Sequence, residues 1–174
     1  MARADETALA SAASALIASA AGDNDIATRE DSWLAEKIAH GKAAIALENG
    51  ELVGFGYWSA WQDGAFVSHS GLVVRADQRG KGLGKRLKQV MMASSDAALP
   101  EAMAMSLTTS PQVKALNLAL GFRMATFDEL TSDEAFWAGC QTCRNYNDVQ
   151  ARGERCCCEA MLRDTPTPPT ESTP

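Results

Sequence analysis

The chain of 174 residues contains no apolar run of about 18 residues, the length that a membrane-spanning helix requires. Its Ala-rich segment at 5–21 opens with two acidic residues, whereas a secretory signal opens with basic ones before a stronger apolar run. We therefore expect no membrane segment and a cytoplasmic protein. The segment predicts a helix that packs loosely, because its larger apolar residues are only Leu9, Leu16 and Ile17.

Basic residues are in the minority, with 16 Lys and Arg against 22 Asp and Glu and a net charge of −6. Nucleic-acid binding depends mostly on Lys and Arg, so this balance argues against a nucleic-acid partner. Six of the basic residues nevertheless fall within residues 75–88, without the interleaved aromatic side chains that stack on bases.

That basic stretch contains the most informative motif. Residues 74–87 read V-R-A-D-Q-R-G-K-G-L-G-K-R-L, in which Gly80, Gly82 and Gly84 lie between an apolar run and a helical pattern. Glycine lets backbone N–H groups converge on an anion, and the following helix N-terminus adds unpaired donors and the positive end of its dipole. The loop therefore predicts a di- or triphosphorylated ligand.

Two common phosphate loops do not fit this motif. A Walker loop needs Ser or Thr after its Lys, but Gly84 is followed by Lys85 and Arg86. A dinucleotide fingerprint needs G-x-G-x-x-G and an acidic residue about 20 positions later, where this chain offers only Glu101 beside Pro100. An ordinary Gly-rich turn with a solvated basic helix face is the simpler alternative.

Hydrophobic periodicity and turn residues predict the order α, β, β, β, loop, α, β, α, β. Asn49-Gly50 is a hairpin turn, and the last helix has Ser110 as N-cap and Gly121 past its end. Three helices are expected: one at 30–40, one after the glycine loop and one after Ser110. The helix after the glycine loop has Leu83, Leu87, Val90 and Met91 on its buried face. The expected strands are 43–47, 52–59, 65–74, 103–108 and 122–127. A meander followed by a βαβ unit predicts the α/β (α+β) class, with a mixed, mostly antiparallel central sheet flanked by helices.

The R-x-x-G-x-G form at 79–84, the order of elements and the A-L-N-L-A-L-G-F segment at 115–122 resemble the GNAT superfamily of acyl-CoA-dependent N-acetyltransferases across residues 30–128. The resemblance implies acetyl-CoA as co-substrate and a sheet that splays after its third strand to hold the pantetheine arm. It assigns backbone contacts with pantetheine to Leu72, Val73 and Val74. It assigns the pyrophosphate to the loop and the helix start, namely Arg79, Gly80, Lys81, Gly82, Leu83, Gly84 and Lys85.

Acetyl transfer to an amine needs a base, a donor for the developing oxyanion and a proton for the departing thiolate. His69 lies five residues before Val74, about where the superfamily often has a Glu or His base, and its ordinary pKa of about 6.5 suits that role directly or through a water. The alternative is a strand histidine hydrogen-bonded to Ser68 or Ser70. We expect the oxyanion donor to be a backbone N–H near Val74.

Asn117 occupies the position, four residues before Gly121, where the superfamily often has a tyrosine acid. Asparagine cannot release a proton, although its amide can hydrogen-bond to a sulfur or a pantetheine carbonyl. A thiolate is a fair leaving group, so water could protonate it. The acid is therefore not identified by this position.

The five cysteines form a separate pattern, C-x₂-C-x₁₂-C-x-C, in which Cys140, Cys143, Cys156 and Cys158 supply four thiolates and Cys157 is spare. In a reducing compartment such residues are thiols or metal ligands rather than disulfides. Four thiolates suit a tetrahedral structural Zn²⁺, which would stabilise a segment with few apolar anchors. Unliganded buried thiols and a redox pair are the alternatives.

The chain thus divides into an N-terminal helix at 1–29, an acetyltransferase core at 30–128, a Cys-rich cap at 129–163 and a Pro- and Thr-rich tail at 164–174 that cannot bury a core. The expected activity transfers an acetyl group from acetyl-CoA to a primary amine of a small metabolite such as an amino acid, by direct attack in a ternary complex. Protein or peptide acetylation and a non-catalytic acyl-CoA sensor are the alternatives, and a homodimer is left open.

Overall fold

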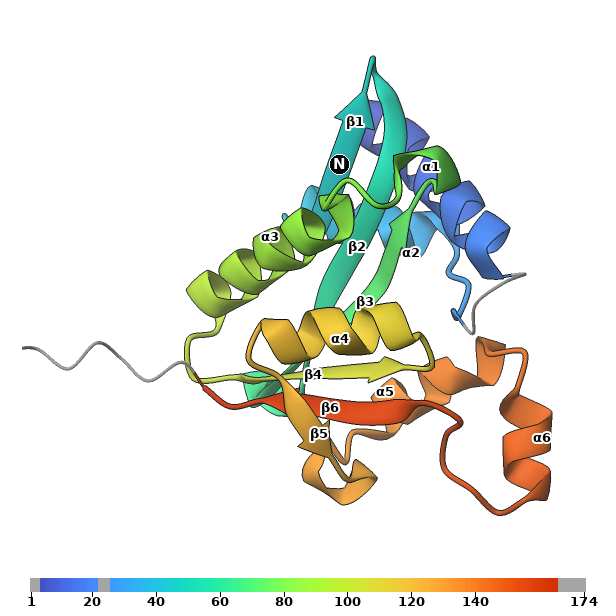
Figure 1. Cartoon of the computed structure of the whole chain (residues 1–174), viewed down its shortest axis with the longest axis vertical. Coiled ribbons are helices and arrows are strands. Elements are labelled where there is room, and N and C mark those ends of the chain that lie inside the picture. The colour runs from blue at the N-terminus through green and yellow to red at the C-terminus, as the bar shows by residue number, and fades with distance from the viewer. Residues whose placement is uncertain (1–3, 22–25, 166–174) are drawn as a thin grey trace, which may run out of the picture.

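Six strands form one sheet in the order β1-β2-β3-β4-β6-β5 (Figure 1). The computed structural model describes residues 4–21 and 26–165, apart from the side chains of residues 4–7, so residues 166–174 of the expected tail lie outside it. The strands are β1 (Ala43–Glu48), β2 (Glu51–Trp61), β3 (Phe66–Val74), β4 (Met103–Thr108), β5 (Arg123–Ala125) and β6 (Glu159–Arg163). Among the strands in the described residues, β3 and β4 are the one parallel pair, which confirms the predicted mixed, mostly antiparallel sheet.

β6 is the strand that the sequence analysis did not predict. It comes from the Cys-rich segment, yet it lies between β4 and β5 and buries Ala160, Met161 and Leu162. β5 joins the sheet by pairing with β6. The core sheet therefore extends beyond residue 128, where the sequence analysis ended it, because this short apolar run supplies a central strand.

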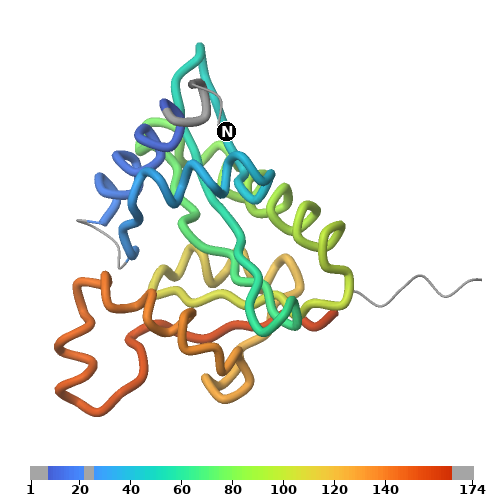
Figure 2. The backbone as a smooth tube through the Cα atoms, turned by 180° about the vertical axis from the view of Figure 1, so that it is seen from behind, coloured from blue at the N-terminus to red at the C-terminus, as the bar shows by residue number. Residues whose placement is uncertain are grey.

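Helices cover both faces of the sheet. They are α1 (Ala4–Ala21), α2 (Asp31–Ala39), α3 (Leu83–Ala98), α4 (Pro111–Ala119), α5 (Glu134–Ala138) and α6 (Tyr146–Ala151). α3 and α4 lie in front of the sheet in Figure 1, and the view from behind in Figure 2 shows α1, α2 and the segment with α5 and α6 on the opposite side. Along β2, Tyr57 packs with α1 and α2, whereas its neighbour Gly56 faces Met91 of α3.

α1 packs closely, so the expectation of loose packing was wrong. Ala10, Ala13 and Ile17 are fully buried, and Ala20 is nearly so. These residues fall on one helix face, and most of them are alanines. Small side chains let α1 approach α2 and the sheet closely, so a stripe of alanines makes the contact that larger side chains make elsewhere.

The buried face of α3 also differs from the prediction. Leu87 and Met91 are buried as expected, but Val90 is 54% exposed, and Lys88 is only 1% exposed. The buried stripe includes Lys88 and Ser95 and therefore lies slightly around the helix from the predicted one. A lysine thus occupies an interior position that its residue type gave no reason to expect.

β3 carries the irregularity that opens the sheet. Its register with β2 shifts between the Phe55–Val73 pair and the Tyr57–Ser70 pair, so β3 accommodates an extra residue around Gly71. Gly71 has a φ of +63°, and a Cβ there would lie 2.5 Å from the Tyr57 ring. Glycine is required at this bulge for both reasons.

Beyond the bulge the two halves of the sheet diverge. β4 pairs with β3 only through Phe66–Ser68, opposite Met103–Met105. Figure 1 shows β3 rising away from β4 after this short ladder. The remaining backbone groups of β3 and β4 therefore face a gap, as the splay expected from the resemblance requires.

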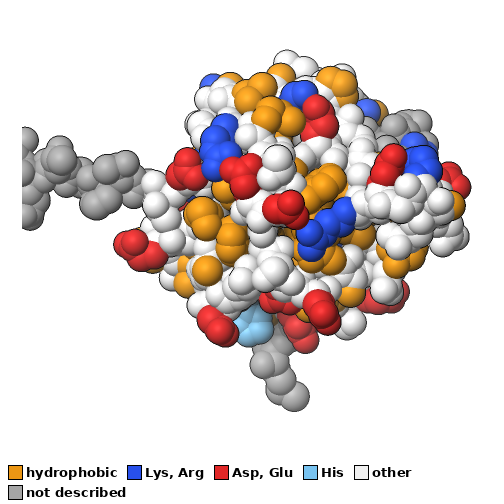
Figure 3. All heavy atoms as spheres, turned by 90° about the horizontal axis from the view of Figure 1, so that it is seen from below, with side chains coloured by type: hydrophobic (Ala, Val, Ile, Leu, Met, Phe, Trp, Pro, Cys, Tyr) orange, Lys and Arg blue, Asp and Glu red, His pale blue; other side chains and the backbone are white. Residues whose placement is uncertain are grey.

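The described surface is chemically mixed. On the face seen from below, acidic, basic and hydrophobic side chains are interspersed (Figure 3). None of the helices in residues 4–21 and 26–165 combines the length and apolar character that a membrane crossing needs.

Candidate active site

Two clefts meet where β3 and β4 diverge. The first has a volume of about 350 Å³, opens beside α3 and α4, and runs along β3 from His69 to Val74. Arg79 and Lys88 also line it, and residues 106–110 form the wall opposite β3. We refer to it as the front cleft, after the view in Figure 1.

The predicted loop residues lie together at one end of the front cleft. Leu72, Val73, Val74 and Arg79 line it directly. Gly80, Lys81 and Gly82 form the turn that follows, and Leu83, Gly84 and Lys85 begin α3. The structure therefore brings all of these sequence-predicted residues into one region.

The start of α3 retains its capacity to bind an anion. Gly82 is the N-cap, with a φ of +75°, and α3 has no side-chain cap. Its first backbone N–H groups therefore keep their hydrogen-bonding capacity. Gly80 has a φ of +78°, and the space that a Cβ would enter at Gly80 or Gly82 is open. Phosphate oxygens can approach this backbone closely.

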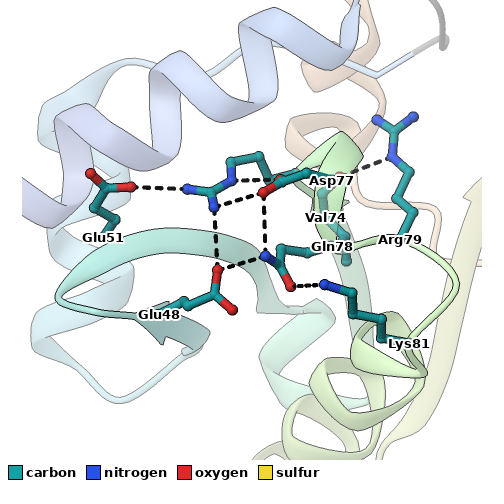
Figure 4. A network of polar contacts seen from close by, with 8 residues as sticks. Glu48, Glu51, Val74, Asp77, Gln78, Arg79 and Lys81 are labelled. Atoms are coloured by element: carbon teal, nitrogen blue, oxygen red, sulfur yellow. Dashed lines mark hydrogen bonds and ion pairs between the residues drawn. The ribbon is translucent and has the colours of Figure 1, made fainter.

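Arg75 ties the loop to the β1–β2 hairpin through Glu48 and Glu51, which Figure 4 labels, and it does not line the front cleft. Its guanidinium contacts Asp77 at 2.7 Å, Glu51 at 3.1 Å and Glu48 at 3.4 Å. The Arg75 guanidinium is therefore paired with three carboxylates. The sequence analysis counted it with the anion-binding residues, and the structure corrects that count.

Gln78 and Arg79 complete the loop. The Gln78 side chain donates to Glu48 at 2.6 Å and accepts from Lys81 Nζ at 2.9 Å. Arg79 turns in another direction, and its Nε donates to the carbonyl oxygen of Val74 at 3.0 Å (Figure 4). Arg79 is thus the loop cation that is held at the rim of the front cleft.

The second cleft, the rear cleft, has a volume of about 260 Å³ and lies on the other face of the sheet. Its walls include Arg29 and the aromatic side chains of Trp33, Tyr57, Trp61 and Phe136. The two clefts share Ile26, Ser70, Gly71, Ser106 and Leu107. A ligand in one cleft can therefore reach a ligand in the other through the gap between β3 and β4.

Arg29 places a positive charge in the rear cleft. Its Nη1 donates to the carbonyl oxygen of Thr28 at 2.8 Å and to Oγ1 of Thr142 at 3.0 Å, and both partners are neutral. Its Cζ lies 5.7 Å from the Trp33 ring centroid. A guanidinium so placed suits a ligand carboxylate. Burial raises the pKa of Tyr57, although Arg29 and Ser70 oppose this shift, so the phenol is protonated at neutral pH.

His69 lines the front cleft and not the rear one, Ser68 lines the rear cleft and not the front one, and Ser70 lines both. The Ser95 hydroxyl donates to the carbonyl oxygen of Met92 and lies 3.0 Å from His69 Nε2, so Nε2 carries the proton in this assignment. Nδ1 is then a buried acceptor without a hydrogen-bond partner among the described residues. Burial, with Lys88 and Arg163 nearby, holds the pKa of His69 well below its usual value. This position does not support direct proton transfer from a ligand in the rear cleft.

Asn117 lines neither cleft. It is fully buried, its Nδ2 donates to Met161 Sδ at 3.5 Å, and its Oδ1 has no partner within the described structure. Its backbone carbonyl accepts from the N–H of Phe122, so it fixes the turn between α4 and β5. The structure therefore separates Asn117 from the residues that line the two clefts.

Four of the five cysteines, Cys140, Cys143, Cys156 and Cys158, line the rear cleft. The thiols of Cys140 and Cys158 hydrogen-bond to Cys156, which lowers the pKa of Cys156 to about 3 and raises the pKa of the two donors. The structure thus brings together the four cysteines that the spacing singled out.

Two functional candidates were missed by sequence reasoning, namely Arg29 and Lys88. Arg29 lies in a segment without a motif, and Lys88 was counted only among the six basic residues of the stretch at 75–88. Only the fold shows that both side chains reach a cleft. An available signal was Gly71, since an isolated glycine inside a strand often marks a bulge.

Residues 13–122, more than half of the chain, match the Acetyltransferase (GNAT) family. Comparison with curated proteins gave no match. Several solved structures share the fold at low identity. N-acetylglutamate synthase from Neisseria gonorrhoeae, complexed with coenzyme A and N-acetyl-glutamate, has a TM-score of 0.66 at 17% identity over 89% of this chain and 32% of its own. The present chain therefore spans about a third of that synthase.

Two further structures match over nearly their whole length. Rv2747 from Mycobacterium tuberculosis, in complex with CoA, has a TM-score of 0.64 at 17% identity over 91% of this chain and 95% of its own. A phosphinothricin acetyltransferase from Sinorhizobium meliloti, in complex with AcCoA, has a TM-score of 0.63 at 18% identity over 96% of this chain and 91% of its own. At these identities the likeness concerns the fold.

Proposed function

The chain belongs to the GNAT acetyltransferase family, whose members transfer acyl groups from acyl-CoA to amines, and on this premise we propose that it acetylates the amino group of a small amino acid. The observation that carries the proposal is the rear cleft, which combines one guanidinium with aromatic walls and meets the front cleft at Ser70 and Ser106. The front cleft takes acetyl-CoA, and the rear cleft takes the acceptor.

The front cleft fits the chemistry of acetyl-CoA. The backbone of Leu72–Val74 would pair with the pantetheine amides, and the N–H groups from Gly80 to Lys85 would hold the pyrophosphate. Arg79 adds a cation at the rim, and the glycines leave the space that phosphate oxygens need. Acetyl-CoA supplies the activated acetyl group at the gap between β3 and β4.

Arg29 supports an acceptor with a carboxylate. A bidentate guanidinium–carboxylate pair orients a small amino acid and leaves its amino group free to face the gap. The structure of the gonococcal synthase contains N-acetyl-glutamate, an acetylated amino acid with two carboxylates. We therefore take glutamate and its close relatives as the first acceptors to test.

Proton transfer divides between the two clefts. The acceptor's ammonium proton passes to bulk solvent through a water in the rear cleft that Ser68 and Ser70 hold, because these serines line this cleft and His69 does not. His69 instead positions acetyl-CoA, because its Nδ1 has no hydrogen-bond partner among the described residues and can accept a hydrogen bond from a pantetheine amide. Gly71 and Leu72 have no register partner in β2, and their backbone N–H groups are our candidates for the oxyanion donor.

Lys88 is our candidate for the acid that protonates the departing CoA thiolate. It lines the front cleft, it is almost fully buried, and burial together with Arg163 lowers its pKa to about 7. An ammonium with such a pKa can donate a proton to a thiolate at neutral pH. It would take the place of the tyrosine that is missing at Asn117.

A matched acceptor panel tests this function. Thiol release from acetyl-CoA is measured with glutamate, glutamine, aspartate, 4-aminobutyrate and a lysine-containing peptide, and products are identified by mass spectrometry. We expect kcat/KM for the best amino acid to exceed that for its analogue without the α-carboxylate by about tenfold or more. Faster turnover of the peptide would favour the peptide acetyltransferase, and acetyl-CoA binding without thiol release would favour a sensor.

A further inference from the structure

The fold brings two distant cysteine pairs to one wall of the rear cleft. Cys140 and Cys143 lie at the ends of the short turn after α5, and Cys156 and Cys158 lie just before β6. All four line the rear cleft, whereas Cys157 between them does not. The chain returns to the same place after α6, although no strand pairing links the two segments.

Hydrogen bonds among the thiols join Cys140, Cys156 and Cys158. The Cys140 and Cys158 thiols both hydrogen-bond to Cys156, and the backbone N–H of Cys158 donates to Cys156 Sγ at 3.4 Å. Backbone donors of this kind stabilise thiolate ligands around a metal. The Sγ atoms of Cys156, Cys157 and Cys158 lie within 4.8 Å of one another, but Cys157 Sγ accepts from Asn145 Nδ2 at 3.4 Å.

The segment that carries these thiols has little core of its own. Between Gly139 and Cys158 the buried residue is Val149, and the regular structure is a short turn and the six-residue α6. The five cysteines form no disulfide. A segment of this length with one core anchor needs another cross-link to hold its shape.

We propose that Cys140, Cys143, Cys156 and Cys158 bind one Zn²⁺ ion. Four thiolates form the soft, tetrahedral ligand set that zinc prefers in structural sites. Because the protein fills all four positions, the ion has no open site for substrate and stabilises the fold without taking part in acetyl transfer. Cys157, held by Asn145, is not a ligand.

The site also controls the acceptor, a consequence that rests on the proposed function. Thr142 lies between the first two ligands, and its hydroxyl accepts a hydrogen bond from Arg29. A Cβ built on Gly139 would lie 3.3 Å from Arg29 Nη2, so this turn sets the space available to the guanidinium. Zinc holds the turn, and the turn positions the cation that binds the acceptor carboxylate.

Metal content tests the zinc site without reference to activity. The wild-type protein and Cys143→Ser, Cys158→Ser and Cys157→Ser variants are produced with added zinc, desalted and analysed for metal and protein. We expect about one equivalent in the wild type and in Cys157→Ser, and less than about a fifth of an equivalent in the other two variants. Equal loss of zinc from Cys157→Ser would overturn the assignment of ligands.

A second measurement uses the wild-type protein alone, so it tests the site even if the cysteine variants fail to fold. The apoprotein, prepared with a chelator and a reductant, is titrated with Co²⁺ and then with Zn²⁺. We expect intense thiolate-to-cobalt absorption that saturates at one equivalent and disappears as zinc displaces cobalt. Absence of these bands, or a mass reduced by two or four hydrogens that reveals disulfides in the purified protein, refutes the site. Either result stands whether or not an amino acid proves to be the acceptor.

Discussion

The Nζ atom of Lys88 lies 4.5 Å from the centroid of the Phe122 ring. This contact joins the middle of α3 to the start of β5, directly after the α4 segment that contains Asn117. Lys88 is also almost fully buried, so the ring face partly replaces water around the ammonium. A buried cation is therefore held beside the front cleft, where we propose that the thiolate leaves.

Replacing Lys88 with Met tests this role. Met keeps the length and apolar stem but removes the charge, so kcat should fall by roughly 10- to 100-fold, at the lower end for general acid catalysis, with KM for acetyl-CoA little changed. In the wild type, kcat should decline as the pH rises above about 7, because Lys88 then loses its proton. The variant should lack this decline. Steady-state kinetics from pH 6 to 9 decide the matter, and unchanged kcat throughout would remove Lys88 from the mechanism.

The same substitution should stabilise the fold. Burial of an ammonium opposes folding, and replacing buried charge with an apolar side chain often stabilises by about 1–4 kcal/mol. Because the pKa of Lys88 is lower in the folded protein, the unfolded chain binds more protons above about pH 7, and wild-type stability should rise with pH there. Urea unfolding of both proteins at pH 7 and pH 9 measures the difference, which should shrink at the higher pH.

His69 should make stability depend on pH in the acidic range. Its pKa is well below the usual value in the folded protein, so the unfolded chain binds more protons as the pH falls below about 6.5. Stability should therefore decrease between pH 7 and pH 5. His69→Gln should flatten this slope. His40→Gln is the matched control, because His40 is the other histidine and is exposed at the end of α2. Identical slopes in the two variants would contradict the assignment of His69 as a buried neutral group.

The kinetics of His69→Ala separate the two roles considered for this residue. A positioning role predicts weaker acetyl-CoA binding with the acidic limb of the pH–rate profile retained. A base would instead lower kcat by roughly 10²–10⁴-fold and remove that limb. We expect the first result, because His69 lines the front cleft and not the rear cleft that we propose for the acceptor.

Arg29→Ala should weaken acceptor binding selectively. Hydrogen bonds to a charged group contribute about 1.5–3 kcal/mol, so KM for the amino acid should rise by roughly 10- to 100-fold. The Kd of acetyl-CoA should not change, since Arg29 does not line the front cleft. Arg152→Ala is the control, because Arg152 is exposed and pairs with Glu154 outside both clefts. Equal KM values in the two variants would exclude Arg29 as the carboxylate ligand.

Gly82→Val should abolish acetyl-CoA binding. The side chain would enter the open space where the pyrophosphate approaches the backbone. Gly50→Val is the control for backbone strain, because Gly50 also has a positive φ, +83°, with open space around it but lies in the β1–β2 turn. Calorimetric titration with acetyl-CoA should show binding only in the control, with similar melting temperatures for both. Retained affinity in Gly82→Val would place the pyrophosphate elsewhere.

The sequence by itself determined the elements whose signals are local. The Asn49-Gly50 turn and the Ser110 cap act within a few positions, and the structure confirms both. The glycine loop before α3 was recognisable for the same reason. The spacing of four cysteines was visible too, because the members of each pair are close in sequence.

Tertiary structure alone decided which side chains meet. β6 could not be read as a core strand, because its partners β4 and β5 lie far earlier in the chain. The direction of His69 depends on strand alternation and on helices packed against both faces, and Arg29 reaches Thr142 only after folding brings residues 113 positions apart together. Contacts of this kind depend on the relative placement of whole elements, and no local pattern of residues encodes that placement.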